Sequence, residues 1–215
     1  MVNNPAFQQW KQQQRACLRK LRQQISAEQR TLWSDAITVA LTQGFPLLEK
    51  HRIGFYWPHQ GEYDPLPAMT FLRTRGATLA LPEVVNKGEP LRFVEWWPEA
   101  PMKKDIYGIP SPDNTREMVV DSIIIPLLGF DERGYRLGYG SGYFDRTLAA
   151  LSPRPLTIGV AFEIFRLPTI HPQQHDIPMD YIVTERSVLR RPGSGADLVP
   201  LTVADCAAIN RPIRN

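Results

Sequence analysis

Three glycines alternate in the segment RLGYGSGYFD, which runs from Arg136 to Asp145. Alternate glycines let the backbone take unusual φ angles and approach a ligand closely. Successive N–H groups of such a loop can point at one anion, and the start of a following helix adds unpaired N–H groups and a positive dipole end. The segment is therefore a candidate phosphate-binding loop.

Charged side chains flank this glycine loop. Arg136 and Arg146 supply positive charge, and Asp145 supplies the hard oxygen ligand that Mg²⁺ prefers. The segment is not a Walker A loop, because no Gly-Lys-Ser/Thr follows, and Tyr143 stands where a dinucleotide fingerprint has its third glycine. Spacing alone leaves two alternatives of equal weight, a phosphate site and a tight strand-to-helix turn.

The longer run IIPLLGFDERGYRLGYGSGYFDR, residues 124–146, resembles the signature of the 5-formyltetrahydrofolate cyclo-ligase family, also called methenyltetrahydrofolate synthetases. It matches every fixed position of the pattern Phe-Asp-x-x-Gly-x-Arg-Leu-Gly-x-Gly-x-Gly-aromatic-aromatic-Asp. The resemblance extends more weakly over residues 15–184. It implies cyclisation of 5-formyltetrahydrofolate to 5,10-methenyltetrahydrofolate with ATP and Mg²⁺, through phosphorylation of the formyl oxygen, attack by N10, and release of ADP and phosphate.

The resemblance also implies roles for individual residues. Arg136 and Tyr143 are expected to be catalytic, and Asp145 and Asp180 to bind Mg²⁺. The residues expected to bind ATP, the co-substrate, are Arg15, Arg19, Arg136, Leu137, Gly138, Tyr139, Gly140, Ser141, Gly142, Tyr143 and Phe144. The residues expected to bind the folate are Phe55, Trp57, Glu62, Tyr107, Tyr139, Gly140, Ser141, Gly142 and Tyr143.

Three further segments agree with the resemblance. In RACLRKLR, Arg19 matches an arginine that the family uses on ATP phosphates, and Arg15 stands where lysine is usual; a solvated basic helix face is the alternative. In FYWPHQGEYDPLP, Glu62 matches a folate-contacting glutamate, and the aromatic residues offer stacking surface for a pterin, although such residues more often lie in the core. In DIYGIPSP, Ser111 replaces the glutamate of the family's Gly-Ile-x-Glu-Pro.

The elements that must position these residues follow from the pattern of apolar residues. Ser26 and Gln29 form a capping box before a helix that ends near Gly44. Helices are expected at 5–24, 27–43, 66–75 and 143–151, and strands at 51–57, 77–81, 91–97, 122–125, 156–162 and 181–184. This alternation predicts an α/β three-layer sandwich whose central sheet is largely parallel and flanked by helices. Ligands then bind beyond the carboxyl ends of strands, in the loops that follow residues 57, 81 and 125.

Residues 1–190 are expected to form a single α/β catalytic domain. The segment PGSG at 192–195 suggests that residues 191–215 form a mobile C-terminal extension, and the segment 98–116 is expected to be loop. Cys17 and Cys206 have neither a disulfide framework nor metal-ligand spacing, so both are expected to be free thiols in a reducing cytosol. The pair His171 and His175 has Pro172 between them, and a metal role is not expected there.

Composition bounds the class of protein. The chain has 215 residues, of which 43% are apolar and 22% charged, as is ordinary for a globular protein. No apolar run approaches the roughly 18 residues of a membrane span, and the net charge is only +3. We therefore expect a cytoplasmic monomer that binds small molecules, with neither nucleic acid nor membrane as a partner.

Two rival functions remain open on the sequence. A nucleotide-binding regulatory module could keep the glycine loop and lack the chemistry, and the departures at Arg15 and Ser111 leave room for it. An RNA-binding protein could use the basic N-terminal helix. The modest net charge and the absence of an RNA-recognition signature argue against the RNA-binding alternative.

Overall fold

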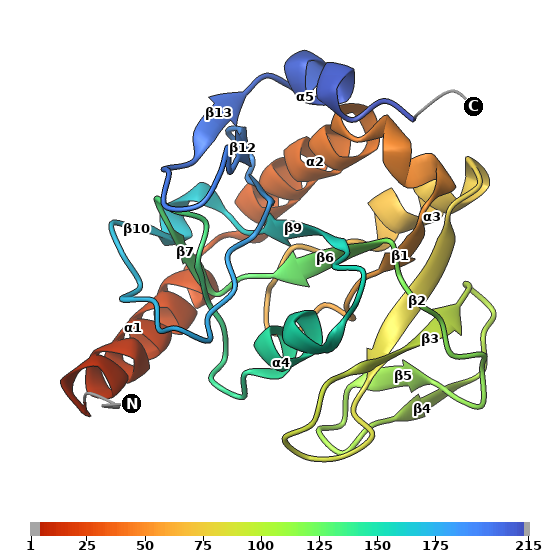
Figure 1. Ribbon diagram of the computed structural model, residues 1–215, viewed down its shortest axis with the longest axis horizontal. Coiled ribbons are helices and arrows are strands. Elements are labelled where there is room, and N and C mark those ends of the chain that lie inside the picture. Colours follow the sequence, from red (N-terminus) through yellow and green to blue (C-terminus); the bar gives the residue numbers. More distant parts are fainter. Residues whose placement is uncertain (1–4, 213–215) are drawn as a thin grey trace.

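The computed structural model describes residues 5–212 and has an eight-stranded central sheet in the order β13-β12-β11-β9-β6-β1-β2-β3 (Figure 1). Parallel pairs join β11, β9, β6, β1 and β2, while β3 adds an antiparallel strand at one edge and β12 and β13 add two at the other. The prediction of an α/β fold with a largely parallel sheet flanked by helices is confirmed. The strands of this sheet are β1 (Arg52–Gly54), β2 (Thr78–Glu83), β3 (Arg92–Trp96), β6 (Ser122–Pro126), β9 (Leu156–Val160), β11 (Tyr181–Val183), β12 (Val188–Arg190) and β13 (Val199–Leu201).

The helices cover both faces of the sheet. The chain passes from β1 to β2 in one direction along the sheet and from β6 to β9 in the other, and right-handed crossovers then place the two connecting helices, α3 and α4, on opposite faces. Helix α2 packs against α3 and α5. The helices are α1 (Pro5–Gln23), α2 (Ala27–Gly44), α3 (Leu66–Thr74), α4 (Tyr143–Ala150) and α5 (Val203–Ile209), with 3₁₀ turns η1 (Pro46–Lys50) and η2 (Glu163–Phe165).

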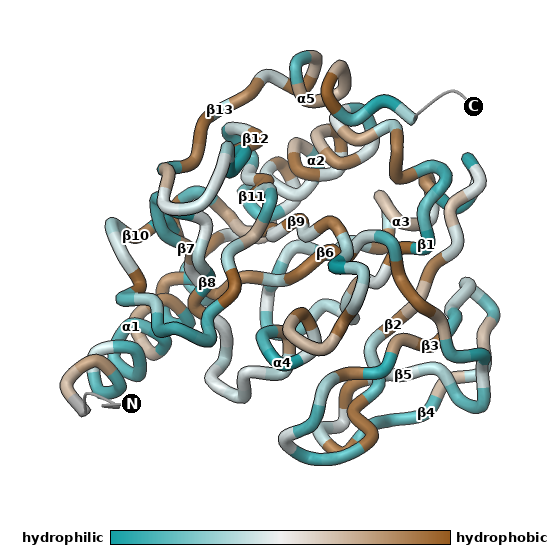
Figure 2. Tube along the Cα trace, in the orientation of Figure 1, coloured by the Kyte–Doolittle hydropathy of each residue, from teal (hydrophilic) through white to brown (hydrophobic). Residues whose placement is uncertain are grey.

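The core follows from the apolar strands. Ile123, Ile124 and Ile125 of β6 have no exposed surface, as expected for a central strand covered on both faces, and this strand is brown in Figure 2. The expected capping box is half realised: the Ser26 side chain accepts a hydrogen bond from the Gln29 backbone N–H at 3.1 Å. None of the helices in residues 5–212 is long and apolar enough to span a membrane.

Two small sheets lie beside the central one. Strands β7 (Gly129–Asp131), β8 (Arg136–Leu137) and β10 (Arg166–Leu167) form the first, which leads directly into the glycine loop. Strands β4 (Met102–Lys104) and β5 (Pro110–Pro112) form the second, a hairpin within the segment that we expected to be loop. The hairpin was not predicted because Pro110 and Pro112 lower the strand propensity of β5. In a two-stranded sheet both strands are edge strands, and edge strands tolerate proline.

The C-terminal segment differs from the expected mobile extension. Residues 199–209 form β13 and α5, β13 pairs with β12, and α5 packs against α2. Leu198 and Cys206 are buried, and the Leu47 N–H donates to the carbonyl of Asn210 at 2.9 Å. Helix α5 lies close to the end of α2, because a Cβ on Gly44 would be in van der Waals contact with the Cys206 sulfur at 3.6 Å. The PGSG segment is thus a turn between packed elements.

The two thiols should report on this packing. Cys17 is exposed on α1, whereas Cys206 is buried and burial raises its pKa to about 11. Because the thiolate is the reactive form, an aromatic disulfide reagent at pH 8 should modify one thiol of the native protein at once and the other only in denaturant. The variant Cys17→Ser should lose the fast phase. Rapid reaction of both native thiols would contradict the docking of α5.

Candidate active site

The glycine loop connects β8 to α4 in a conformation that needs its glycines. Gly140 and Gly142 have φ angles of +105° and +65°, which side-chain-bearing residues rarely adopt. A Cβ on Gly140 would lie 3.4 Å from the Arg15 guanidinium carbon, so the loop and α1 approach closely here. Gly142 caps α4 with no side-chain hydrogen bond. The loop therefore presents its backbone and the first turn of α4 as a candidate anion site.

A stripe of cations on α1 faces the loop. Lys11, Arg15 and Arg22 are four and seven residues apart, which puts them on one side of a helix. The Arg15 Nε donates to the Gly138 carbonyl at 2.8 Å, and the Arg19 guanidinium lies 5.7 Å from the Tyr139 ring centre. Two of the three arginines predicted to bind ATP, Arg15 and Arg19, thus lie against the glycine loop. Burial, and then the charge of Arg19, lower the pKa of Arg15.

Glu62 lies between the loop and the carboxyl end of β1. Its Oε1 accepts a hydrogen bond from the Tyr139 hydroxyl at 2.6 Å and lies 3.8 Å from Arg22 Nη1, while Oε2 accepts from the His59 N–H at 3.0 Å. Burial raises the pKa of the Glu62 carboxyl, although the hydrogen bonds and Arg22 act against that rise. Tyr139 of the glycine loop therefore contacts the residue expected to bind folate.

The predicted aromatic residues have different positions. Phe55 has no exposed surface and packs edge-on against Trp96 with ring centres 5.3 Å apart, so it lies in the core behind the site. Trp57 is half-buried against the same indole. Tyr107, in the β4–β5 hairpin, is half-exposed and its hydroxyl is 2.7 Å from that of Tyr143, which joins the hairpin to the start of α4.

The other loop residues predicted to bind ATP or folate do not all direct their side chains to the site. Leu137 is buried in β8, and Phe144 is half-buried and packs against the core. Ser141 is exposed, and its carbonyl accepts a hydrogen bond from Arg146 Nη2 at 2.7 Å. Ser111, where the family has a glutamate, is buried in β5, and its hydroxyl has no hydrogen-bond partner among the described residues.

Arg136 and Asp145 form a buried ion pair. Their closest N–O distance is 2.6 Å, with side chains 5% and 19% exposed, and Arg136 Nη1 also donates to the Ile177 carbonyl at 3.0 Å. Asp145 Oδ1 further accepts from the Ile177 N–H at 3.2 Å. Burial lowers the pKa of Arg136, and Asp145 opposes that shift. The Arg136 guanidinium, which was expected to bind phosphates, thus contacts the predicted metal ligand Asp145 and the irregular segment before β11.

Asp180 has other partners. Its Oδ2 accepts from the N–H and the hydroxyl of Thr157 at 3.0 and 2.8 Å, and Oδ1 lies 3.5 Å from both Arg154 and Arg191. Asp145 and Asp180 share no hydrogen-bond or ion-pair partner among the described residues, and residues 5–212 contain no cluster of three or more His, Cys, Asp or Glu side chains arranged for a metal. Asp180 lies beside the amino ends of β9 and β11, since Thr157 is the second residue of β9.

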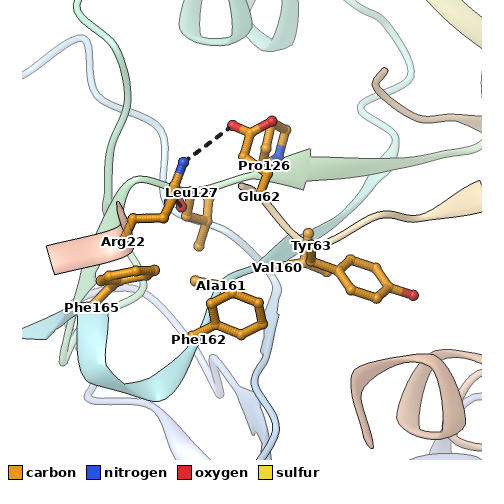
Figure 3. A pocket seen from close by; sticks show the side chains of 9 residues that line it. All are labelled: Arg22, Glu62, Tyr63, Pro126, Leu127, Val160, Ala161, Phe162 and Phe165. Carbon is orange, nitrogen blue, oxygen red and sulfur yellow. Dashed lines mark hydrogen bonds and ion pairs between the residues drawn. The ribbon is translucent and has the colours of Figure 1, made fainter. Parts of the chain in front are cut away.

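A small cavity adjoins Glu62 at the carboxyl ends of β6 and β9 (Figure 3). The Arg22 and Glu62 side chains point toward one another at its lining, and Phe162 and Phe165 form an aromatic wall. This is the edge of the sheet at which an α/β fold is expected to bind its ligands. The cavity is lined by Arg22, Glu62, Tyr63, Pro126, Leu127, Val160, Ala161, Phe162 and Phe165.

Three charged residues that shape this region were not predicted as site residues. Lys11 and Asp176 form an ion pair of 3.0 Å with side chains 7% and 14% exposed, and Asp176 also accepts from the Gln173 N–H at 2.7 Å. Arg22 is buried beside Glu62. The helical spacing of Lys11, Arg15 and Arg22 was a signal for the cations, but Asp176 lies in an irregular segment that no periodicity marks.

Known proteins similar to this chain belong to the family that the glycine-loop motif resembles. The family model described as the 5-formyltetrahydrofolate cyclo-ligase family matches residues 7–185. A 5-formyltetrahydrofolate cyclo-ligase of Haemophilus influenzae is 26% identical over 178 residues, covering 80% of this chain and 95% of that protein. One from Mus musculus is 27% identical over 187 residues, covering 80% and 92%. Strands β12 and β13 and helix α5 lie outside the family match.

Solved structures show the same fold. The 5,10-methenyltetrahydrofolate synthetase of Aquifex aeolicus superposes with a TM-score of 0.74 at 28% sequence identity, covering 86% of this chain and 95% of that one. The synthetase of Mycoplasma pneumoniae superposes with a TM-score of 0.67 at 22% identity, covering 81% and 98%. The family match over residues 7–185 includes the glycine loop, the segment around Glu62 and the sheet from β1 to β11.

Proposed function

This chain belongs to the 5-formyltetrahydrofolate cyclo-ligase family, and we propose that it closes 5-formyltetrahydrofolate to 5,10-methenyltetrahydrofolate with ATP and Mg²⁺. One contact supports the proposal most directly: the hydroxyl of Tyr139 in the glycine loop donates to Glu62 Oε1 at 2.6 Å. It brings the candidate phosphate site and the candidate folate site together. The two substrates of such a reaction must meet at that junction.

The chemistry starts from a poor leaving group, the formyl oxygen. In the proposed reaction this oxygen attacks the γ-phosphorus of ATP and ADP departs. The N10 lone pair then attacks the activated carbon, phosphate leaves with the former formyl oxygen, and the N10 proton passes to solvent. No protein nucleophile is needed. The protein contributes positioning and charge neutralisation, as in other phosphoryl transfers.

The proposed roles follow the contacts. Arg15 and Arg19 lie against the loop and would neutralise phosphate charge, while N–H groups from Gly138 to Tyr143 would hold the transferring group. Glu62 would orient the folate. Tyr107 and Tyr143, joined through their hydroxyls, would close the opposite side of the site.

The residues fit Mg²⁺ through one protein carboxylate. Mg²⁺ is commonly held by one or two carboxylates together with substrate phosphates and water, so Asp145, in the first turn of α4 after the loop, is the proposed ligand. When bound, Mg²⁺ would supply charge neutralisation at the phosphates. Asp180 is proposed as a ligand only because of the family resemblance. Both of its carboxylate oxygens face Thr157, Arg154 or Arg191, and these contacts favour a structural role.

The function has a direct test. Purified protein is incubated with 5-formyltetrahydrofolate, ATP and Mg²⁺, and the methenyl product is followed by its absorbance while ADP is assayed separately. We expect equal amounts of the two products and no turnover without Mg²⁺. Well-folded protein that binds ATP and gives no methenyl product would instead support the regulatory-module alternative.

The variant Glu62→Gln should show the importance of the carboxylate charge. Because burial raises the Glu62 pKa above its ordinary value of 4.5, the protonated form accumulates at higher pH than for an exposed glutamate. The wild-type kcat/KM for the folate should therefore fall as the pH drops through that raised pKa. In Glu62→Gln we expect this acid limb to disappear and the folate KM to rise about tenfold. An unchanged pH profile would contradict a role for the charge.

A further inference from the structure

Arg22 is a buried charge that the proposed mechanism does not yet use. It lies on the inner side of α1 and is 3% exposed. Its Nη1 donates to the Tyr139 hydroxyl at 2.7 Å, and its Nη2 donates to the Leu127 carbonyl just beyond β6 at 3.0 Å. The guanidinium also lies over the Phe165 ring, 5.2 Å from its centre. Three separate segments thus hold this side chain in one orientation.

The direction of hydrogen bonding between Arg22, Tyr139 and Glu62 is fixed by their chemistry. A guanidinium has donors and no acceptor, so the Tyr139 oxygen must accept from Arg22. The only proton of that hydroxyl is then left to point at Glu62 Oε1, 2.6 Å away. Arg22 therefore sets the orientation of Tyr139, and Tyr139 in turn holds one oxygen of Glu62.

The charge of Arg22 acts on Glu62 as well. The carboxylate is buried, and the groups that face it are Arg22 from α1, Tyr139 from the glycine loop, and His59 and Tyr56 from its own segment. Arg22 is the permanent cation of this set, and its Nη1 is 3.8 Å from Oε1 at the lining of the cavity in Figure 3. A buried carboxylate without such a partner would favour its neutral form.

We propose that Arg22 is a positioning residue for the folate side of the site, which directs the Tyr139 hydroxyl onto Glu62 and keeps Glu62 ionised without touching a substrate itself. The inference rests on the proposed function, in which Glu62 orients the folate. A purely structural anchor for α1 is the competing explanation. It would require only the carbonyl of Leu127 and the Phe165 ring.

The two explanations differ in what Arg22→Met changes. Positioning predicts a folate KM raised by about tenfold or more, an ATP KM within about twofold of wild type, and an acid limb of kcat/KM for the folate moved to higher pH. In Arg22→Lys the acid limb should move less than in Arg22→Met, since lysine keeps the charge but lacks the forked geometry. Lys20→Met, an exposed cation of the same helix, is the matched control and should leave all three quantities unchanged.

A second measurement needs no turnover. Titration of the Glu62 carboxyl by carbon NMR in the ligand-free protein should give a higher pKa in Arg22→Met than in wild type, with Glu62→Gln assigning the signal. An unchanged Glu62 titration would overturn the inference, as would equal increases in both KM values without movement of the acid limb. If wild-type protein shows no turnover but the titration shifts as expected, the proposed function fails and the effect of Arg22 on Glu62 stands.

Discussion

Replacement of Arg136 by methionine is expected to lower the free energy of unfolding by about 3 kcal/mol, because removing one partner of a buried ion pair leaves the other charge uncompensated. Asp145 would remain at 19% side-chain exposure without its cation, and the Ile177 carbonyl would lose a donor. The loss should appear in denaturant unfolding as a lower midpoint with an unchanged slope. Methionine keeps most of the apolar stem, so the change removes mainly charge and hydrogen bonds.

A double-mutant cycle separates the ion pair from general damage. Asp145→Asn alone should also destabilise the protein, and Arg136→Met with Asp145→Asn together should cost clearly less than the sum, by at least about 1 kcal/mol. The control is Arg52→Met, which breaks the more exposed pair with Asp121 and should cost under about 1 kcal/mol. Additive losses at Arg136 and Asp145 would show that the pair is not coupled.

The same variants test whether Asp145 acts only as a metal ligand or also stabilises the fold. A residue that served only as a metal ligand would lose Mg²⁺-dependent activity on conversion to asparagine while keeping its stability. Its contacts with Arg136 and the Ile177 N–H predict losses of both. Activity should therefore be measured well below the unfolding temperature of each variant, where a remaining loss reports on the chemistry alone.

Gly140→Ala is expected to lower kcat/KM by about a hundredfold or more, equivalent to roughly 2.7 kcal/mol of transition-state stabilisation. The φ angle of +105° is strained for alanine, and the new methyl group would lie 3.4 Å from the guanidinium of Arg15. Relief of the φ strain would move the loop backbone, whose Gly138 carbonyl accepts a hydrogen bond from Arg15. Small displacements of positioning groups are costly in phosphoryl transfer because the catalysis depends on their alignment.

Backbone strain alone must be separated from this effect. Gly88→Ala provides the control, because Gly88 has a φ of +86° in a turn before β3 and no atom lies near its would-be Cβ. It should lose about 1 kcal/mol of stability and no activity. Comparable activity losses in Gly88→Ala and Gly140→Ala would mean that the catalytic defect reflects stability and not the loop.

Much of this protein was predictable because its signals are local. The alternation of glycines before a helix indicated an anion loop, and the apolar run at Ile123–Ile125 indicated a central strand, since both depend on residues adjacent in the chain. The capping residue Ser26 marked the start of α2 for the same reason. The hairpin at 102–112 was not predicted because its prolines lower strand propensity. The packed C-terminal segment was not predicted because α5 packs against α2, which is far away in the sequence.

The sequence by itself determined the α/β class, the loop at 136–145 and the residue types around it. Only the tertiary structure decided which charges meet. It paired Arg136 with Asp145 inside the protein, placed Arg22 between Tyr139 and Glu62, and gave Asp180 other partners. The physical reason is that these contacts depend on distance and burial, and the partners, between 9 and 117 positions apart in the sequence, have neither until the sheet and α1 are assembled.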